Sequence, residues 1–187
     1  SKPQVINCLV CDLSFVPESS YPKDIETIYA EVQDPTYLLN KRSRYKTFQE
    51  SLTQISSFLP DKGNLLEVGS YCGFFLDTFK KKYNNWECIG VEPSKWAAEY
   101  ARNHLKINTR TGTLENNIKD LPSDFDTVVA WDVLEHLNDP SAFLIQINSV
   151  MKLNGIFCFS TLDIDNWFPK LMGKHWPWLM EMHLFYY

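Results

Sequence analysis

The 187-residue sequence lacks several features that would assign it to a broad class of proteins. No apolar run reaches the roughly 18 residues that predict a membrane span, and the chain has no signal-peptide pattern at its start. Basic residues are not in excess, because 18 Lys and Arg stand against 23 Asp and Glu, and the net charge is −5. This balance argues against binding to polyanions, although a local basic patch would still allow it. We therefore expect neither a membrane nor a nucleic acid as partner.

A disulfide framework is also not expected. The five cysteines are an odd number, and three of them, Cys72, Cys88 and Cys158, fall within apparent core elements. Free buried thiols suit a reducing compartment, so we predict a cytoplasmic protein. The chain begins with Ser1 rather than Met, which leads us to expect that an upstream piece has been removed.

The composition that remains is that of a folded domain, with 44% hydrophobic and 14% aromatic residues. Residues 1–37 form a lead-in without clear periodicity. Residues 38–59 repeat apolar positions at steps of three and four, which predicts a helix that ends before Pro60. We expect a helical lead-in over 38–60, a core over 64–160 and a substrate-side segment over 161–187.

From residue 64 the sequence alternates between short apolar runs and helical stretches. The helix after residue 139 has Asp139 and Pro140 as its cap and first turn, and we expect it to end near Leu153 before a stop at Gly155. This alternation predicts an α/β fold of the Rossmann-like, doubly wound type, with a mainly parallel sheet covered by helices on both faces. The five predicted strands are 65–68, 88–91, 107–111, 125–131 and 156–160.

The loop after the first strand reads E-V-G-S-Y-C-G, from Glu67 to Gly73. Ligands of doubly wound sheets bind at the carboxyl ends of the strands, so this loop is a candidate binding site. A dinucleotide fingerprint needs glycine at i, i+2 and i+5. Counting from Gly69, those positions hold Tyr71 and Phe74, and the dinucleotide pattern fails twice.

The same loop resembles motif I of class I S-adenosylmethionine (SAM) dependent methyltransferases, (D/E)-x-G-x-G-x-G. Glu67, Gly69 and Gly73 match it, and the resemblance implies that they bind SAM. Tyr71 replaces the middle glycine, so that either its ring crowds the methionine part of the cofactor or the loop turns differently. Glu92 follows the second strand, where a carboxylate can accept hydrogen bonds from both ribose hydroxyls.

Two later segments strengthen the resemblance. The loop T-G-T-L-E-N follows the third strand, and in the family it covers the adenine, which implies contacts from Thr113 and Leu114. The run FDTVVAWDVLEHLNDP (125–140) resembles a signature found after the fourth strand in one group of these enzymes, and it implies that Asp132 meets the methionine part of SAM. A neighbouring Glu–His pair, Glu135 and His136, has no second His or Cys at ligand spacing, so we expect no metal there.

The last segment, GKHWPWLMEMHLFYY (173–187), resembles the one that follows the fifth strand in this group. It supplies candidates for an acceptor site, of which His183 is the catalytic candidate, because a neutral His can accept a proton from a hydroxyl. The alternative is that these side chains only cover the edge of the core. The candidates are His175, Trp176, Trp178 and His183.

The lead-in over residues 1–37 carries one C-x-x-C pair, Cys8 and Cys11. A small zinc ribbon with two such pairs often precedes the core in the similar group, which makes the lead-in a candidate remnant of a ribbon. One pair supplies only two of the four ligands that structural zinc requires, and two incidental cysteines are an equal alternative.

We therefore predict a SAM-dependent methyltransferase, with SAM as cofactor and a small molecule, such as a sugar or other metabolite, as methyl acceptor. The alternatives are a catalytically silent binding scaffold and, third, an NAD-dependent dehydrogenase. Only 27 residues follow Ser160, so we expect the antiparallel hairpin that ends this fold to be incomplete and turnover to be poor. The atom that is methylated and the oligomeric state are left open.

Overall fold

The computed structural model describes residues 2–187, with the side chain of Glu26 left out. Its centre is a parallel sheet of five strands in the order β5-β4-β3-β6-β7. The chain reverses direction across the sheet between β3 and β6, which gives the switch point of a doubly wound fold. The predicted Rossmann-like class is confirmed. The strands are β3 (Asn64–Val68), β4 (Glu87–Glu92), β5 (Thr109–Thr111), β6 (Phe125–Trp131) and β7 (Met151–Ser160).

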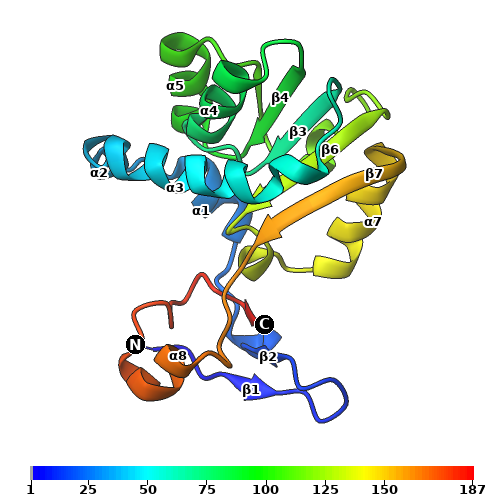
Figure 1. Ribbon diagram of the computed structural model, residues 1–187. Helices are drawn as coiled ribbons and strands as arrows, with labels where there is room; N and C mark the ends of the chain where they lie inside the picture. Colours follow the sequence, from blue (N-terminus) through cyan, green and yellow to red (C-terminus); the bar gives the residue numbers. More distant parts are fainter. Residues whose placement is uncertain (1) are drawn as a thin grey trace.

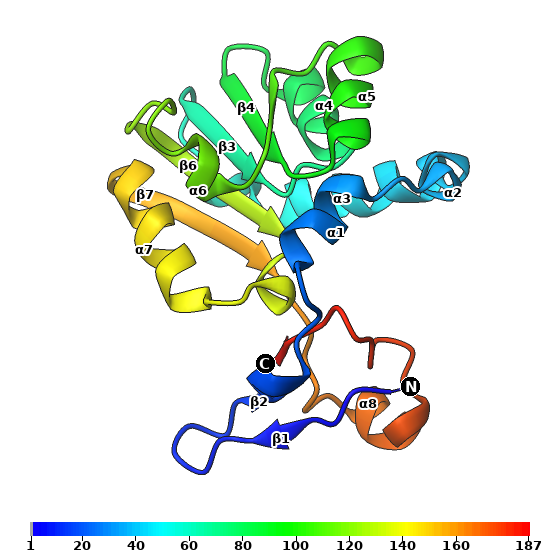
Figure 2. The same ribbon diagram turned by 180° about the vertical axis from the view of Figure 1, so that it is seen from behind.

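Both faces of this sheet are covered by helices, because neighbouring strand residues point to opposite sides. Leu65 packs in one hydrophobic cluster and Leu66 in the other. The Leu65 cluster receives α3 (Lys41–Ile55), α4 (Phe74–Lys82) and α5 (Lys95–Leu105), whereas the Leu66 cluster receives α6 (Leu114–Asn117) and α7 (Pro140–Val150). Figures 1 and 2 show these helices from opposite sides.

The helix boundaries differ from the sequence prediction at two places. The helix predicted over 38–59 is α3, which ends at Ile55 and continues as a 3-10 turn, η2 (Ser56–Phe58). Helix α7 ends at Val150 rather than near Leu153, and Gly155 lies inside β7 instead of ending a helix. A Cβ at Gly155 would lie 3.1 Å from the Phe125 carbonyl oxygen, so the glycine permits a close approach of two backbones.

Side chains cap the amino ends of α5 and α7, and the cap at Asp139 was predicted. The Ser94 hydroxyl oxygen accepts a hydrogen bond from the Ala97 amide at 3.1 Å, at the start of α5. The Asp139 carboxylate accepts one from the Ala142 amide at 2.9 Å, at the start of α7. Each cap satisfies an amide that has no partner within the helix.

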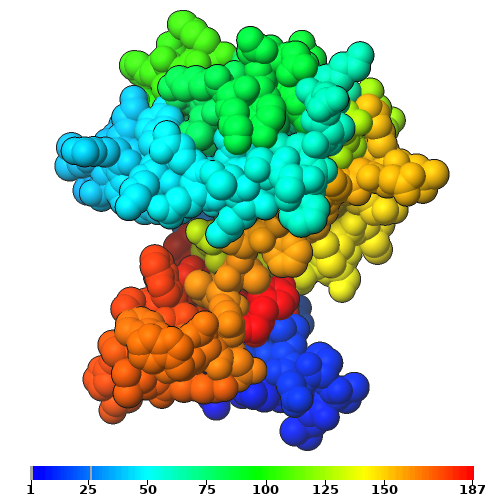
Figure 3. Space-filling model, in the orientation of Figure 1, coloured from blue at the N-terminus to red at the C-terminus, as the bar shows by residue number. Residues whose placement is uncertain are grey.

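The two ends of the chain fold together as a small lobe, although neither shows periodicity in its sequence. An antiparallel sheet joins β1 (Ile6–Asn7), β2 (Ser14–Phe15) and β8 (Phe185–Tyr186). Val16, Trp176 and Tyr186 form its core. The lobe lies beyond the carboxyl ends of β6 and β7 (Figures 1 and 2), and Figure 3 shows a narrowing between it and the main body. It also holds η1 (Glu18–Ser20), α8 (Trp167–Met172) and η4 (Gly173–His175).

Two short helices, α1 (Ile25–Glu31) and α2 (Pro35–Leu39), connect the small lobe to α3. They pass along the carboxyl edge of the large sheet, where the predicted binding loops lie (Figures 1 and 2). A 3-10 turn, η3 (Leu134–His136), follows β6 at the same edge.

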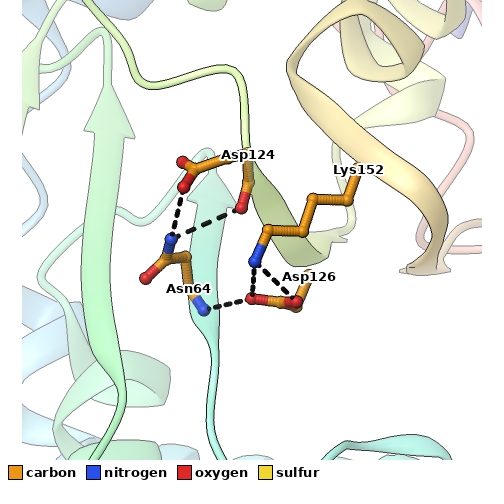
Figure 4. A network of polar contacts seen from close by, with 4 residues as sticks. All are labelled: Asn64, Asp124, Asp126 and Lys152. Carbon is orange, nitrogen blue, oxygen red and sulfur yellow. Dashed lines mark hydrogen bonds and ion pairs between the residues drawn. The ribbon is translucent and has the colours of Figure 1, made fainter.

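The opposite, amino edge of the sheet is tied by a polar network between three strands (Figure 4). The Asp126 carboxylate accepts hydrogen bonds from the Asn64 backbone amide at 2.8 Å and from the Lys152 ammonium at 2.8 and 2.9 Å. The Asn64 side-chain amide in turn donates to the Asp124 carboxylate at 3.1 Å. These contacts join β3, β6 and β7 where the strands begin.

Among residues 2–187, no helix is both long enough and apolar enough to cross a bilayer. All five cysteines are unpaired, and Cys72 and Cys88 are buried in the core as the sequence indicated.

Candidate functional site

The loop after β3 adopts a conformation that depends on its two glycines. Gly69 has a φ of +72° and Gly73 a φ of +78°, both in the region that favours glycine. A Cβ at Gly69 would lie 2.6 Å from Cγ2 of Val133, so a side chain there would displace the loop after β6. The Gly69 amide donates to the Val91 carbonyl at 2.8 Å, which holds the loop against β4.

Glu92 stands at the centre of this loop system. One carboxylate oxygen accepts a hydrogen bond from the Tyr71 amide at 2.7 Å, and the other accepts one from the Ser94 amide at 2.8 Å. Each oxygen therefore keeps lone-pair capacity for a further donor. The side chain is buried, and this burial raises the pKa of Glu92 to about 7, although the two amides oppose the rise.

A second buried acid, Glu67, lies beside it. Burial, and then the charge of Glu92, raise the pKa of Glu67 well above its ordinary value. Its Oε2 atom has no hydrogen-bond partner among the described residues, and neither has the hydroxyl of Ser70 in the adjacent loop. Unpaired buried polar atoms are rare in folded proteins, and a bound ligand is one explanation for them.

Tyr71 does not simply fill the place of the missing glycine. Its backbone has a φ of +43°, an uncommon conformation for a residue with a side chain. Its ring packs edge-on against Tyr37 of α2, with centroids 4.6 Å apart, and lies 6.1 Å from the ring of Trp96. The loop therefore turns as if it held a glycine, while its side chain joins an aromatic cluster beneath α2.

The loop after β5 reaches the same site through its backbone. The Gly112 amide donates to the Glu92 carbonyl at 2.9 Å. Thr113 caps α6 in a capping box with Asn116, and the side chain of Leu114 is buried in the core. Thr113 and Leu114 were predicted to contact the adenine. Thr113 is half-buried at the edge, whereas the side chain of Leu114 points into the core.

Asp132 ends β6 at the same edge, as predicted. It is exposed, has a φ of +54°, and accepts a hydrogen bond from the Ser160 hydroxyl at 2.6 Å. The Asp132 amide donates to the Ser160 carbonyl at 3.1 Å, which links the ends of β6 and β7. Trp131, just before it, packs its ring on that of Phe75, with the centroids 5.1 Å apart.

The sequence did not indicate that the connecting helices α1 and α2 contact these loops. The Ser94 hydroxyl donates to the Val32 carbonyl at 2.7 Å, and the Tyr29 hydroxyl lies 2.6 Å from Nδ1 of His136. With the Tyr37–Tyr71 ring pair, these contacts hold the segment from Tyr29 to Tyr37 across the carboxyl edge. The only sign of these contacts in the sequence is the presence of aromatic residues in the lead-in, which otherwise shows no periodicity.

The predicted acceptor-side residues separate into two groups. His183 is buried and lies next to η3, because the Leu184 amide donates to the Glu135 carbonyl at 2.6 Å. Trp178 is exposed, and its carbonyl contacts Nδ1 of His183 at 2.7 Å. His175 is exposed on η4 and Trp176 is buried in the small lobe, so neither joins this cluster.

Two surface hollows lie away from this edge. They are lined by α3 and its neighbours, including Tyr45 and Gln49, and contain none of the predicted site residues. The residues predicted to bind the cofactor instead lie where β3, β4, β5 and β6 end, beneath α1 and α2.

The chain resembles known proteins over most of its length. Residues 40–187 match the model of a family described as a methyltransferase domain. A ubiquinone biosynthesis O-methyltransferase of Rhodopseudomonas palustris (strain HaA2) is 33% identical over 108 residues, which cover 55% of this chain and 41% of that protein. The chain thus matches less than half the length of this curated relative.

Solved structures resemble the fold as well. A SAM-dependent methyltransferase from Archaeoglobus fulgidus superposes with a TM-score of 0.60 at 20% identity, covering 74% of this chain and 63% of the other. A SAM-dependent methyltransferase from Thermotoga maritima gives a TM-score of 0.56 at 26% identity, over 74% and 61% of the two chains. Both leave about a quarter of this chain unmatched.

Proposed function

We propose that this chain, which belongs to the methyltransferase domain family, binds SAM at the carboxyl edge of its sheet and methylates a small-molecule acceptor. The arrangement of Glu92 is the observation that carries the proposal. Its two oxygens each accept one backbone amide and keep capacity for another donor, beside a glycine loop that a Cβ would displace. Two neighbouring ribose hydroxyls match such a carboxylate.

The other residues of the edge fit the rest of the cofactor. Glu67 offers a buried, unpaired carboxyl oxygen, and Asp132 adds an exposed carboxylate on the side of β6. SAM carries an ammonium and a sulfonium, and carboxyl groups are suited to cations. Gly69, Tyr71 and Gly73 would present backbone to the ligand, and Thr113 with the backbone of Leu114 would border the adenine.

When bound, SAM supplies a methyl group made electrophilic by a positively charged sulfur. The chain's own contribution is to orient the acceptor and to remove its proton. His183 fits the second role in a metal-free protein, because Nδ1 contacts the Trp178 carbonyl and must therefore carry the hydrogen. Nε2 is then unprotonated, and burial lowers the pKa of His183, which keeps the ring neutral near pH 7.

A hydroxyl on a sugar or another metabolite is the acceptor we favour. The matched relative from Rhodopseudomonas palustris is named as an O-methyltransferase, and a neutral His can accept the proton of a hydroxyl as the methyl group is transferred. An acceptor role for residues 161–187 is supported by the position of His183, because the charge of Asp132, which we assign to the methionine end of SAM, acts on its ring. We retain residues 38–187 as the proposed methyltransferase domain and 1–37 as its lead-in.

A silent SAM-binding scaffold is the second candidate. Tyr71, in place of a motif glycine and covered by Tyr37, favours it because the ring pair narrows the space above the loop. A dehydrogenase remains the third candidate, disfavoured by the two missing glycines at Tyr71 and Phe74.

Calorimetric titration with SAM, S-adenosylhomocysteine and NAD separates these candidates. We expect both SAM and S-adenosylhomocysteine to bind to the wild type and NAD not to bind. Turnover is then assayed as S-adenosylhomocysteine released in the presence of candidate hydroxyl acceptors. Binding without release for any acceptor would favour the scaffold, and NAD binding would overturn the proposal.

A further inference from the structure

Three side chains that the cofactor site does not use meet below η3. Glu135, His136 and His183 each offer one ligand atom, and these atoms all lie within 4.8 Å of one another. The rings of His136 and His183 have their centroids 4.7 Å apart. The sequence concealed this cluster, because 46 residues separate the two histidines and the small lobe brings them together.

The Nδ1 atom of each histidine contacts a main-chain carbonyl: the Trp178 carbonyl lies 2.7 Å from Nδ1 of His183, and the Met182 carbonyl lies 2.9 Å from Nδ1 of His136. A carbonyl oxygen only accepts, so Nδ1 of His183 carries the hydrogen and its Nε2 keeps a free lone pair. Nδ1 of His136 also lies 2.6 Å from the Tyr29 hydroxyl, which in turn donates to the Met182 carbonyl at 3.4 Å. A hydrogen on Nδ1 of His136 satisfies both neighbours and leaves its Nε2 free as well. The Nδ1 contacts fix each ring as carbonyl partners do in known metal sites.

The carboxylate in the cluster lacks a cation. Glu135 is 1% exposed, and its Oε2 atom accepts a hydrogen bond from the Thr161 hydroxyl at 3.0 Å. Among residues 2–187, no Lys or Arg forms an ion pair with it. Asp132 adds a second negative charge that acts on all three groups. A buried carboxylate with this surrounding favours a cation, because an unpaired buried charge is costly.

The geometry points to a divalent transition-metal site formed by Glu135, His136 and His183. Two imidazole nitrogens and one carboxylate oxygen suit Zn²⁺, Co²⁺, Fe²⁺ or Mn²⁺ better than Mg²⁺ or Ca²⁺, which prefer oxygen ligands. Ligands about 2.1 Å from a tetrahedral metal lie about 3.4 Å apart, so small side-chain movements would close the cluster. Three protein ligands leave an open position, which is typical of sites that also bind water or a substrate.

The metal and the proposed base compete for one lone pair. With a metal bound, Nε2 of His183 is no longer a proton acceptor, and an oxygen at the open position would lose its proton more readily instead. This consequence for an acceptor rests on the proposed function, whereas the metal site itself does not. The test therefore measures metal binding and cofactor binding separately.

The first measurement is a titration with Co²⁺, followed by visible absorption, and with Zn²⁺, followed by metal content after dialysis. Cys8 and Cys11 are thiols that bind zinc themselves, so a Cys8→Ser/Cys11→Ser variant serves as the reference protein. We expect one equivalent of metal in this reference, with a cobalt spectrum that lacks the charge-transfer band of a thiolate ligand. The proposed site would be wrong if the reference protein did not bind metal tightly, or if metal bound only to the wild type, through Cys8 and Cys11.

The second measurement uses variants in the same background. His183→Ala and the isosteric Glu135→Gln should each weaken metal binding by more than about tenfold, the scale at which even outer partners of ligands matter. His175→Ala removes an exposed histidine of the small lobe and should leave binding unchanged. If His183→Ala does not fold, Glu135→Gln keeps the test valid, and the melting temperature of that variant should no longer rise with added Zn²⁺.

Binding of S-adenosylhomocysteine to the same variants separates the two proposals. We expect Glu135→Gln to keep the cofactor affinity of the wild type while it loses the metal. If the reference protein, His183→Ala and Glu135→Gln all bound metal equally, the metal site would be wrong and the cofactor proposal would stand.

Discussion

Acidic residues have opposite surroundings at the two edges of the central sheet. At the amino edge, Asp126 is paired with Lys152 and with the Asn64 amide. At the carboxyl edge, Glu92 and Glu67 are buried, and within residues 2–187 no Lys or Arg forms an ion pair with either acid. Parallel strands begin and end together, so one sheet presents both environments. The paired edge contributes to stability, and the unpaired edge is where we propose that a ligand binds.

The pKa values of these acids differ in direction for the same reason. Burial raises the pKa of Asp126 somewhat, but the hydrogen bonds from Lys152 and Asn64 outweigh it, and the pKa lies below its ordinary value. Its contribution to stability is therefore present near neutral pH and is lost as the pH falls. Burial raises the pKa of Glu92 from 4.5 to about 7, so its ionisation costs stability progressively as the pH rises between those values.

The largest expected effect comes from removing the acid of the carboxyl edge. Glu92→Ala should weaken binding of S-adenosylhomocysteine by about 1–3 kcal/mol, the scale of hydrogen bonds to a charged group. Calorimetry measures the change. The matched control is Glu87→Ala, because Glu87 begins the same strand at the amino edge and is exposed. An unchanged affinity in Glu92→Ala would remove Glu92 from the ribose role.

The second prediction concerns pH. If the ionised form of Glu92 binds the ribose, affinity should rise by about tenfold between pH 6 and pH 8, because the ionised fraction rises from about one tenth to about nine tenths around a pKa of about 7. The same titration on Glu92→Gln should show a nearly flat profile. A steep profile that survives in Glu92→Gln would assign the titration to another group, with Glu67 as the nearest acid.

Much of the carboxyl edge could be predicted from the sequence, because its signals are local. Gly69 and Gly73 were marked by their spacing after a buried strand, and Glu92 by its place after the next. The structure brings these three positions to one edge. Their roles in binding remain predictions. The C-terminal ends of α3 and α7 were less predictable, because no glycine or proline directly follows either helix. Met151 continues the apolar pattern of α7 into β7.

Contacts between distant segments could not be predicted. Tyr37 gave no sign that it would pack on Tyr71, and His183 gave no sign that it would meet His136. Spacing rules detect a metal site only when the ligands lie close in sequence, and the expectation of no metal rested on such a rule. Here the small lobe, built from both ends of the chain, brings His183 to Glu135 and His136 through tertiary packing. No local sequence pattern encodes such a contact.

The third prediction tests the amino edge. Asp126→Asn should lower the free energy of unfolding at pH 7 by about 1 kcal/mol, because the ion pair is partly exposed and its contribution is screened. Affinity for S-adenosylhomocysteine should not change. A double-mutant cycle with Lys152→Met, measured by chemical denaturation, isolates the pair. A loss of cofactor affinity in Asp126→Asn would contradict the division of roles between the two edges.

The smallest expected effect is that of Tyr71→Gly, where two contributions nearly cancel. Glycine relieves the positive φ of +43° but adds entropy to the unfolded loop, so these two backbone contributions to stability nearly cancel. The ring, however, supports Tyr37 and therefore α2 above the loop. Loss of this ring pair should cost about 0.5–1.5 kcal/mol of stabilisation. We expect part of that cost to appear as a roughly threefold weaker affinity for S-adenosylhomocysteine.

Tyr71→Phe is the matched control, because it keeps the ring and its packing and should bind S-adenosylhomocysteine as the wild type does. Calorimetry on both variants distinguishes the two explanations of the unusual motif. Tighter binding in Tyr71→Gly would mean that the ring obstructs the cofactor, as the sequence pattern first suggested. Weaker binding in Tyr71→Gly, but not in Tyr71→Phe, would mean that the ring contact with α2 helps to cover the bound cofactor. The left-handed backbone at position 71 would then keep the turn that a glycine makes in the motif.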